Sequence, residues 1–426
     1  MVLATYYELL KEYTNFKTVH DTNQFSSEAE KTTERIKNLL KSVGFEIKEC
    51  YQDDIPILIA KYILNKNLPT ALIYTNYDSE CFEFSPEWKN NPFHLYLWKD
   101  EVIGKGVAEH KGQFMIFLTT ILHLIENNKL GYNITLLIDG TQNKVGTDII
   151  PLIENNKAEL YADFCFFSTG HGIQDKATIE VGQRGSINFD IVLSNPPSEG
   201  GQRGFGTEQI INPNLEMSKI LNRMYNGNKI AIPYFYYNVE KAKQEVEIKR
   251  YGTNLEYKTI TKANNKNYTI LEPTLEITGI ISLPKFEKSN VFPKKTIANL
   301  HMNIVNNQNY QEIINGLQQR LKYNIPKNLK TELIIHEAYN PCKYHPQNPY
   351  LQKATALLTG AYTTPAEYQQ KPHGIKIAQT IQTSVCEHII AIPFAHQESN
   401  IWLANEHLRT DTIKKAFDFC MAFFSK

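Results

Sequence analysis

The sequence lacks an excess of either charge, since 45 Lys and Arg residues balance 45 Asp and Glu residues. This balance argues against a partner that is nucleic acid or an anionic membrane surface, because both select basic proteins. A long apolar run is missing too: the longest, residues 114–125, is too short to span a bilayer and predicts a buried helix. The N-terminal stretch has neither the basic start nor the apolar core of a signal peptide. We therefore expect a cytoplasmic protein.

Cysteine is scarce, and the six residues are scattered with no C-x-x-C pair among them. In a chain of 426 residues this pattern favours reduced, mostly buried thiols over a disulfide framework. The sequence also has no P-loop or dinucleotide fingerprint. No Ser-His-Asp or Cys-His set can be ordered along it. These absences argue against the common nucleotide-binding and nucleophile-based enzyme classes.

What is present is a normal globular composition, with 42% hydrophobic and 21% charged residues over a length that predicts two domains. In the first part of the chain, strand-like runs alternate with helical ones, which predicts an α/β domain with a mostly parallel sheet. Sites in such sheets lie beyond the carboxyl ends of the strands. The predicted helices are 26–44 and 112–127, and the predicted strands are 45–50, 55–63, 70–76, 132–140 and 163–169.

The pattern changes at about residue 186, where alternating strands surround helices near 214–226 and 309–323. This arrangement is typical of an α+β unit. Residues 348–426 return to α/β character. The sequence therefore predicts a discontinuous α/β domain, 1–185 and 338–426, that carries an inserted α+β domain, 186–337.

Five segments of the α/β part, together with the start of the insert, carry recognisable motifs. A predicted strand ends in TNYD at Asn76 and Asp78, and GKGVAEHKG follows at residues 104–112 with Glu109 inside it. These segments, followed along the chain by DGTQNKVG, FFSTG, VGQRGSINFDIVL and NIWLANE, resemble the motifs of the two-zinc metallopeptidase family in the same order. That family includes aminoacylase, carnosinase, succinyl-diaminopimelate desuccinylase and the glutamate carboxypeptidases.

The resemblance implies the fold of that family, an α/β catalytic-type domain with an inserted α+β lid or dimerisation domain. It also implies site positions. The family's first strand ends in G-H-x-D, which places Asn76 at the zinc-binding His and Asp78 at the Asp that orients it. In the loop G-R-G-x-x-D-x-K-G, Glu109 replaces the Asp that bridges two zincs.

The remaining motifs are changed in the same way. The family's G-x-E-E-x-G supplies the catalytic base and a ligand, and DGTQNKVG (139–146) puts Asn143 and Lys144 there. This loop is about one residue longer than the family's, which leaves the register open. The next Asp ligand corresponds to Thr169, and the final His ligand corresponds to Trp402.

These residues do not suit two-zinc hydrolysis, which needs several N or O ligands and a carboxylate base for the bridging water. Asn143 cannot accept and return a proton, and the Trp402 indole has no lone pair to offer. Only Glu109 remains competent among the ligand positions. Because the loss of two dications would leave Asp78 and Glu109 as buried, repelling carboxylates, we expect the Lys144 ammonium to lie between them.

The insert differs from the family pattern as well. The loop that normally carries an H-S-G reads SEGGQRG at 198–204, and the Arg used for the substrate carboxylate corresponds to Asn303. The family's G-G-S-I-P substrate loop survives only as PHGIKI at 372–377. By resemblance alone, we expect a homodimer formed through the insert.

Three functions stay open. The leading one is a catalytically degenerate homologue without zinc or another cofactor, which binds a peptide-like or acyl-amino-acid ligand or regulates a partner. The second is an active amide or peptide hydrolase with a relocated zinc site. The third is a purely structural or interaction protein. The predicted ligand pocket is Asn76, Asp78, Glu109, Asn143, Lys144, Thr169 and Trp402, and the relocated metal site is Glu109, His110, His171 and His396.

Overall fold

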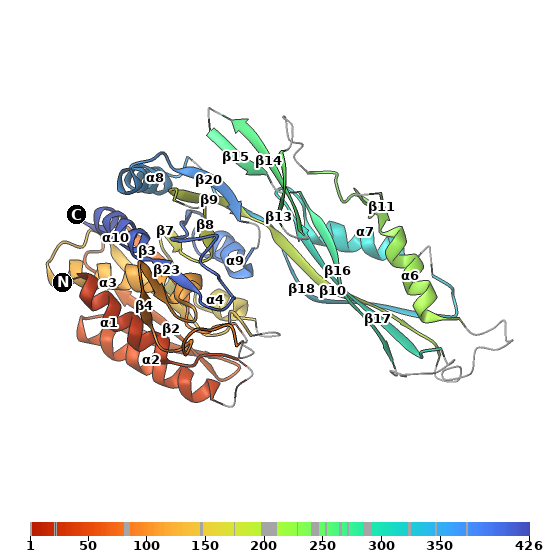
Figure 1. Ribbon diagram of the computed structural model, residues 1–426, viewed down its shortest axis with the longest axis horizontal. Helices are drawn as coiled ribbons and strands as arrows, with labels where there is room; N and C mark the ends of the chain where they lie inside the picture. The colour runs from red at the N-terminus through yellow and green to blue at the C-terminus, as the bar shows by residue number, and fades with distance from the viewer. Residues whose placement is uncertain are drawn as a thin grey trace.

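The computed structural model describes residues 2–426 apart from 21, 23, 81–85, 145–147, 174, 197–210, 228, 240–246, 252–253, 264–265, 271, 284–291, 323–324, 346 and 372–373. Between 247 and 270 only the backbone is described. Figure 1 shows a larger body that holds both chain ends, and an elongated second body built from the middle of the sequence.

The larger body is built on a mixed twelve-stranded sheet. Its centre is parallel, since β6, β3, β7 and β21 pair in that order with their carboxyl ends at one edge. This confirms the predicted α/β class with its mostly parallel central sheet. The strands are β1 (Glu46–Gln52), β2 (Ile55–Tyr62), β3 (Thr70–Asn76), β6 (Asn133–Asp139), β7 (Phe164–Phe167), β9 (Thr178–Gln183), β19 (Cys342–Lys343), β20 (Glu367–Lys371), β21 (Ile389–Ala391) and, at the far edge, β13 (Glu247–Tyr251), β14 (Asn254–Ala263) and β15 (Lys266–Ile270).

Helices cover both faces of this sheet because side chains alternate along its strands. In β3, Ile73 packs with one set of helices and Leu72 packs with the other. The first face is covered by α1 (Val2–Asn15), α2 (Phe25–Ser42), α3 (Gly112–Glu126), α8 (Pro349–Tyr362) and α10 (Thr410–Phe424). The second is covered by α4 (Ile150–Asn155), α5 (Lys157–Leu160) and α9 (Lys376–Ser384). As predicted from its apolar sequence, α3 is a buried helix rather than a surface one.

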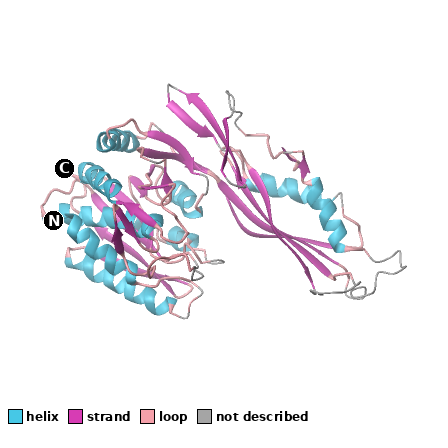
Figure 2. Ribbon diagram, in the orientation of Figure 1, coloured by secondary structure: helices cyan, strands magenta, loops and turns pink. Residues whose placement is uncertain are grey.

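The second body is an antiparallel four-stranded sheet with two helices on one face (Figure 2). Its elements are β10 (Gly185–Ser194), β16 (Thr274–Leu283), β17 (Lys295–Ile304), β18 (Lys330–Tyr339), α6 (Pro213–Arg223) and α7 (Tyr310–Lys322). Apolar side chains on β16, an edge strand, remain exposed, Ile280 by 56% and Ile281 by 47%.

The two bodies are joined in a way that the sequence does not predict. Strands β13–β15 lie within the predicted insert but do not join its four-stranded sheet. They extend the larger sheet, where β15 pairs in parallel with β20. The insert bounds of 186 and 337 remain a prediction, and they fall close to the start of β10 and the end of β18.

Short strands complete the larger body around the central sheet. They are β4 (Tyr96–Trp98), β5 (Glu101–Ile103), β8 (His171–Gly172), β22 (Ala395–His396) and β23 (His407–Arg409), while β11 (Tyr225–Asn226) and β12 (Lys229–Ile230) form a small ribbon in the second body. A π-helical turn, η1 (Val107–Lys111), immediately precedes α3. No helix among the described residues has the length and apolarity needed to cross a bilayer. All of the described cysteines are free thiols.

Candidate functional site

A cavity of about 360 Å³ opens at the carboxyl ends of the parallel strands. This is the edge at which the strand pattern predicts a site. Its polar lining comes from strand ends and from loops after β6, β7 and β22. The residues that line it are Tyr74, Asn76, Glu109, Gln142, Asn143, Thr169, Gly170, His171, Glu180, Lys371, Gly374, Ile375, Gln397, Asn400, Ile401, Trp402 and Leu403.

Asp78 lies behind this lining and organises it. Its carboxylate accepts hydrogen bonds from Asn76 Nδ2 at 3.0 Å and from the backbone N–H of Asn143 at 2.6 Å. The third donor is His20 Nε2 at 3.0 Å, which also lies 3.1 Å from Gly140 O. Because both partners of this nitrogen are acceptors, it carries the proton. Asp78 is therefore buried with a full set of donors, and the two asparagines are held in place by it.

The turn after β6 is fixed by close packing and by a second buried acid. A Cβ atom on Gly140 would lie 2.1 Å from the Tyr77 hydroxyl, so only glycine fits. Burial and the nearby charge of Asp78 raise the pKa of Asp139 to about 7, although its bonds from Thr141 oppose the shift. Near neutral pH this carboxyl is partly protonated.

The loop that carries Glu109 is held by Glu406 from the far end of the chain. Glu406 is fully buried, and its carboxylate accepts from the backbone N–H groups of Gly106, Ala108 and Glu109 at 2.8, 2.9 and 2.8 Å. Gly106 has a φ of 76°, the left-handed conformation that glycine adopts without cost. The final Glu of NIWLANE thus shapes the site through backbone amides.

Gln113 ties this loop to two others. Its Nε2 donates to Ala108 O at 2.5 Å and to Gly170 O at 2.9 Å. Its Oε1 accepts from Ser168 Oγ at 2.9 Å and from the backbone N–H of Phe394 at 2.8 Å. One fully buried amide therefore fixes three segments that surround the cavity.

Glu109 faces the cavity with one oxygen paired and the other unpaired. Trp402 Nε1 donates to Oε1 at 2.9 Å. His110 Nδ1 lies 3.3 Å from Oε2, but Oε2 accepts no hydrogen bond from the described residues. Burial alone would raise the pKa of Glu109, yet His110 and the Trp402 donor bring the pKa below its usual value. Glu109 is therefore a carboxylate at neutral pH.

Glu180 on β9 also lines the cavity; it is 3% exposed, and its Oε1 accepts no hydrogen bond from the described residues. Burial raises the pKa of this carboxyl, and the charge of Lys371 opposes the rise. The Lys371 ammonium donates to Thr169 O at 3.3 Å. Thr169 therefore lines the cavity as expected, and its backbone carbonyl accepts the hydrogen bond from Lys371.

Two expectations about the predicted pocket need correction. Lys144 does not line the cavity, and in the described part of the chain no ion pair joins it to Asp78 or Glu109. The expectation that the Lys144 ammonium lies between the two carboxylates is therefore wrong. His20 hydrogen-bonds to Asp78 and Trp402 hydrogen-bonds to Glu109 instead. Asp78 lies behind the lining and not in it.

Gln142 takes the place in the lining that was expected of Lys144, and it accepts from the Tyr74 hydroxyl at 3.0 Å. The sequence analysis aligned the loop 139–146 with the family motif G-x-E-E-x-G by its second glycine, Gly146. That glycine lies outside the described residues. The structure favours the register counted from Gly140, with Gln142 and Asn143 as the two residues after G-x.

The histidines of the relocated metal site lie in different surroundings. His171 lines the cavity, whereas His110 and His396 are buried outside it. Burial and the neighbouring His407 lower the pKa of His396. Across the described ranges, no three His, Cys, Asp or Glu side chains gather closely enough to hold a metal ion.

In the second body, Asn303 donates to Thr274 Oγ1 at 3.1 Å and does not line the cavity. The SEGGQRG stretch at 198–204 and the first two residues of PHGIKI lie outside the described residues.

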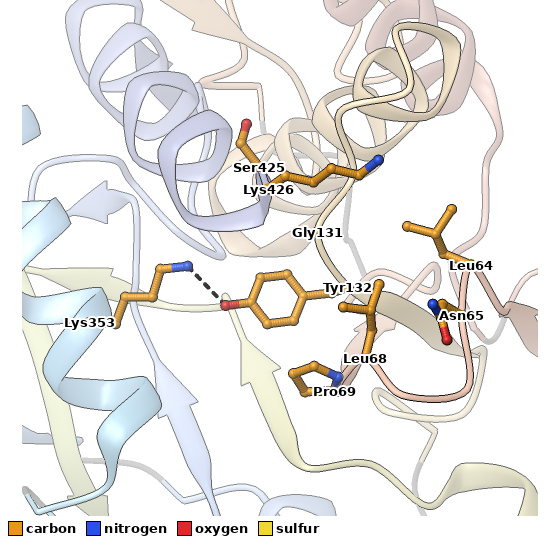
Figure 3. A pocket seen from close by; sticks show the side chains of 9 residues that line it. All are labelled: Leu64, Asn65, Leu68, Pro69, Gly131, Tyr132, Lys353, Ser425 and Lys426. Carbon is orange, nitrogen blue, oxygen red and sulfur yellow. Dashed lines mark hydrogen bonds between the residues drawn. The ribbon is translucent and has the colours of Figure 1, made fainter.

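A second cavity, of about 690 Å³, lies near the C-terminal residues and is lined by Leu64, Asn65, Leu68, Pro69, Gly131, Tyr132, Lys353, Ser425 and Lys426 (Figure 3). The Lys353 ammonium donates to the Tyr132 hydroxyl at 2.9 Å, the bond drawn in Figure 3. No carboxylate or imidazole side chain is among these residues, and the ionisable side chains that line this cavity are those of Tyr132, Lys353 and Lys426.

Sequence reasoning missed several residues that build the site, because nothing in the local sequence marks them. His20 lies between helices, and Gln113 lies within an apolar helix. Glu406 was noted only as part of a motif. Two buried lysines, Lys105 and Lys111, also lie in the loop before α3. Burial lowers the pKa of Lys111 to about 8.

Comparison with known proteins places this site in a family context. A scan against protein-family models finds no match. Among curated proteins, the chain is 22% identical over 373 residues to the probable di- and tripeptidase DUG2 of Saccharomyces cerevisiae, covering 82% of this chain and 41% of that one. It is 29% identical over 247 residues to a succinyl-diaminopimelate desuccinylase of Orientia tsutsugamushi, covering 53% and 58%. The chain thus spans about half the length of these relatives.

Solved structures cover the whole chain. The M20 family metallo-carboxypeptidase Sso-CP2 from Sulfolobus solfataricus matches with a TM-score of 0.81 and 18% identity over 98% of both chains. Human carnosine dipeptidase 1 matches with a TM-score of 0.75 and 16% identity over 99% of this chain and 96% of that one. The resemblance inferred from the sequence is confirmed: the fold is that of the M20 metallopeptidases, and the curated homologues are peptidases and hydrolases of the same kind.

Proposed function

We propose that this chain is a metallopeptidase-like protein that has lost the two-zinc centre and binds a small peptide-like or acyl-amino-acid ligand in the remaining cavity without hydrolysing it. The observation that carries the proposal is the bond from Trp402 Nε1 to Glu109 Oε1. An N–H donor now hydrogen-bonds to the carboxylate at the position that would bridge two metal ions in the family, and an N–H donor cannot coordinate a metal.

The donor set supports the same conclusion. The positions implied by the resemblance offer the amides of Asn76 and Asn143, the Thr169 hydroxyl and an indole. Zinc sites in proteins use thiolate, imidazole and carboxylate ligands, so these residues do not fit a zinc pair. Gln142 and Asn143, which follow β6, include no carboxylate that could take a proton from water and return it to a leaving amine.

The test is metal content by elemental analysis, on protein purified without chelators and again after zinc is added. We expect about zero zinc per chain and no thermal shift. A positive control is the variant Asn76→His, Asn143→Glu, Thr169→Asp and Trp402→His, which restores the ligand types and should bind zinc. One or more tightly held zinc ions in the unaltered protein would overturn the proposal.

A second candidate is an active metal-dependent amide hydrolase with a relocated site. It is favoured by one observation: Glu109 Oε2 and both ring nitrogens of His110 are buried next to each other without hydrogen-bond partners. A single metal there would need further ligands to move in. Zinc binding that is lost in His110→Ala would support this function, and turnover of dipeptides would establish it.

A third proposal concerns partners. The exposed edge strand β16 and its isoleucines would suit pairing of two copies through the second body, as the resemblance implies. Regulation of a related active enzyme through the same surface is the alternative. Sedimentation analysis tests the first: a monomer at micromolar concentration would contradict it, and Ile280→Lys should weaken any dimer.

A further inference from the structure

The cavity lining includes carboxyl oxygens that have no hydrogen-bond donor among the described residues. Two carboxylate oxygens, Glu109 Oε2 and Glu180 Oε1, are buried in residues only 6% and 3% exposed, and neither accepts a hydrogen bond from the described residues. Both residues line the cavity. A buried acceptor without a partner costs free energy, because it has given up its bonds to water. Each of these oxygens is satisfied when a ligand brings a donor.

The two asparagines add further acceptors to the lining. Asn76 Nδ2 donates to Asp78 O and to Asp78 Oδ1, each at 3.0 Å, which uses both of its hydrogens. Asn143 Nδ2 donates to Asp78 O at 3.2 Å. Since the partners are a carboxylate and a carbonyl, the nitrogens must face them. For Asn76 only the amide oxygen remains for a ligand, whereas Asn143 offers its amide oxygen and one remaining Nδ2 hydrogen.

The cations nearby do not remove the need for a donor. The Lys371 ammonium donates to Thr169 O, and its charge opposes the rise in the pKa of Glu180 that burial causes, but Glu180 Oε1 accepts no hydrogen bond from the described residues. Trp402 Nε1 donates to Oε1 of Glu109, and His110 Nδ1 lies 3.3 Å from Oε2 without forming a hydrogen bond to it. Asp78 adds a further negative charge behind the lining. An anionic ligand would therefore meet two carboxylates, and a cationic one would pair with both.

We propose that the cavity selects a small ligand with a protonated amine, which donates to Glu109 Oε2 and Glu180 Oε1. The inference rests on the proposed function, because it names the chemical class of the ligand that the cavity would bind. The amine can belong to an amino acid or short peptide, or to a free diamine, and the experiment separates these sources.

The experiment is calorimetric titration of the full chain with three probes: 1,4-diaminobutane, succinate as the dianion of equal carbon length, and lysine amide. We expect the amines to bind and succinate not to bind. Tighter binding of lysine amide would indicate an amino-acid source, and tighter binding of the diamine would indicate a polyamine. The variant Glu180→Gln should weaken amine binding roughly tenfold, because a charge-assisted bond becomes a neutral one.

The matched control is Glu367→Gln, on the neighbouring strand β20, where the carboxylate is exposed and pairs with Lys176. Amine affinity should not change in this variant. Glu109→Gln provides a second test if Glu180→Gln does not fold.

Unchanged amine affinity in both Glu180→Gln and Glu109→Gln would overturn the inference. Binding of succinate in place of the amines would also overturn it, but would leave the proposed ligand-binding function standing. If none of the probes binds and the protein takes up zinc, both the inference and the proposed function fail.

Discussion

The loop that supports the site and the cavity that it faces differ in how completely their polar groups are bonded. In the support, Glu406 accepts three backbone N–H groups and Gln113 uses both ends of its amide to join three segments. In the cavity, Glu109 and Glu180 each keep an oxygen that accepts no hydrogen bond from the part of the chain that the structure describes. The polar groups of Glu406 and Gln113 are hydrogen-bonded within the chain. The two oxygens in the cavity are acceptors that a bound ligand could satisfy.

This difference separates interactions that stabilise the fold from side chains that matter only for what the cavity binds. Removing Glu406 would leave buried N–H groups without acceptors, so the fold itself depends on it. The side chains at Asn76, Thr169 and Trp402 can change without leaving buried polar groups unbonded, provided that the new side chain makes the same hydrogen bonds. These positions can therefore vary while the surrounding architecture is kept.

The largest effect is expected from Glu406→Ala. Three buried backbone donors would lose their acceptor, at about 1–3 kcal/mol each, so the variant should lose at least about 3 kcal/mol of unfolding free energy or fail to fold. Urea denaturation measures this. The control is Glu126→Ala at the end of α3, an exposed position where we expect a change within about 0.5 kcal/mol. Equal stabilities would contradict the supporting role.

Asp139→Asn should have the next largest effect, and its sign depends on pH. The pKa of Asp139 is raised to about 7 in the folded state, so its contribution to stability is fully present below about pH 4 and is lost as the pH rises through 7. The amide cannot ionise. The variant should match the parent at pH 4 and be more stable at pH 8, by on the order of 2 kcal/mol.

Thermal unfolding at several pH values tests this prediction. A difference between variant and parent that does not change with pH would contradict it. The comparison with Glu406 is sharpened at the same time, because burial raises the pKa of both acids, while the backbone N–H groups of Gly106 and Glu109 oppose the rise at Glu406.

Much of the fold could be predicted from the sequence, because strand and helix periodicity is a local signal. The predicted strand 70–76 coincides with β3, and the buried helix at 112–127 is α3. The return of β13–β15 to the larger sheet could not be predicted, since their alternating pattern does not specify a partner strand.

The site was predictable where a motif fixes the position and not where partners are distant in sequence. Asn76 and Glu109 line the cavity as their motifs implied. The partner of Asp78 is His20, which lies 58 residues earlier, and Glu109 is paired by Trp402 from 293 residues away. A partner for the buried charges of Asp78 and Glu109 was expected, but Lys144 was inferred from its position in the motif and not from a contact.

Trp402→Phe should have a smaller effect than either buried acid, because Trp402 is about half exposed and the change removes its hydrogen bond to Glu109. We expect a loss of about 1 kcal/mol in urea denaturation at pH 7. Trp98→Phe, on the exposed strand β4, is the matched control and should be neutral. If both variants behave alike, the Trp402–Glu109 bond does not stabilise the folded protein.

The smallest effect is expected from Lys144→Met, which should change stability by less than about 0.5 kcal/mol because no carboxylate of the described residues pairs with this ammonium. His20→Phe keeps an aromatic ring beside Phe25 but removes a donor to Asp78, and should cost about 2 kcal/mol. Urea denaturation of the two variants decides which residue compensates the buried charge. A large loss in Lys144→Met with an unchanged His20→Phe would return that role to the lysine.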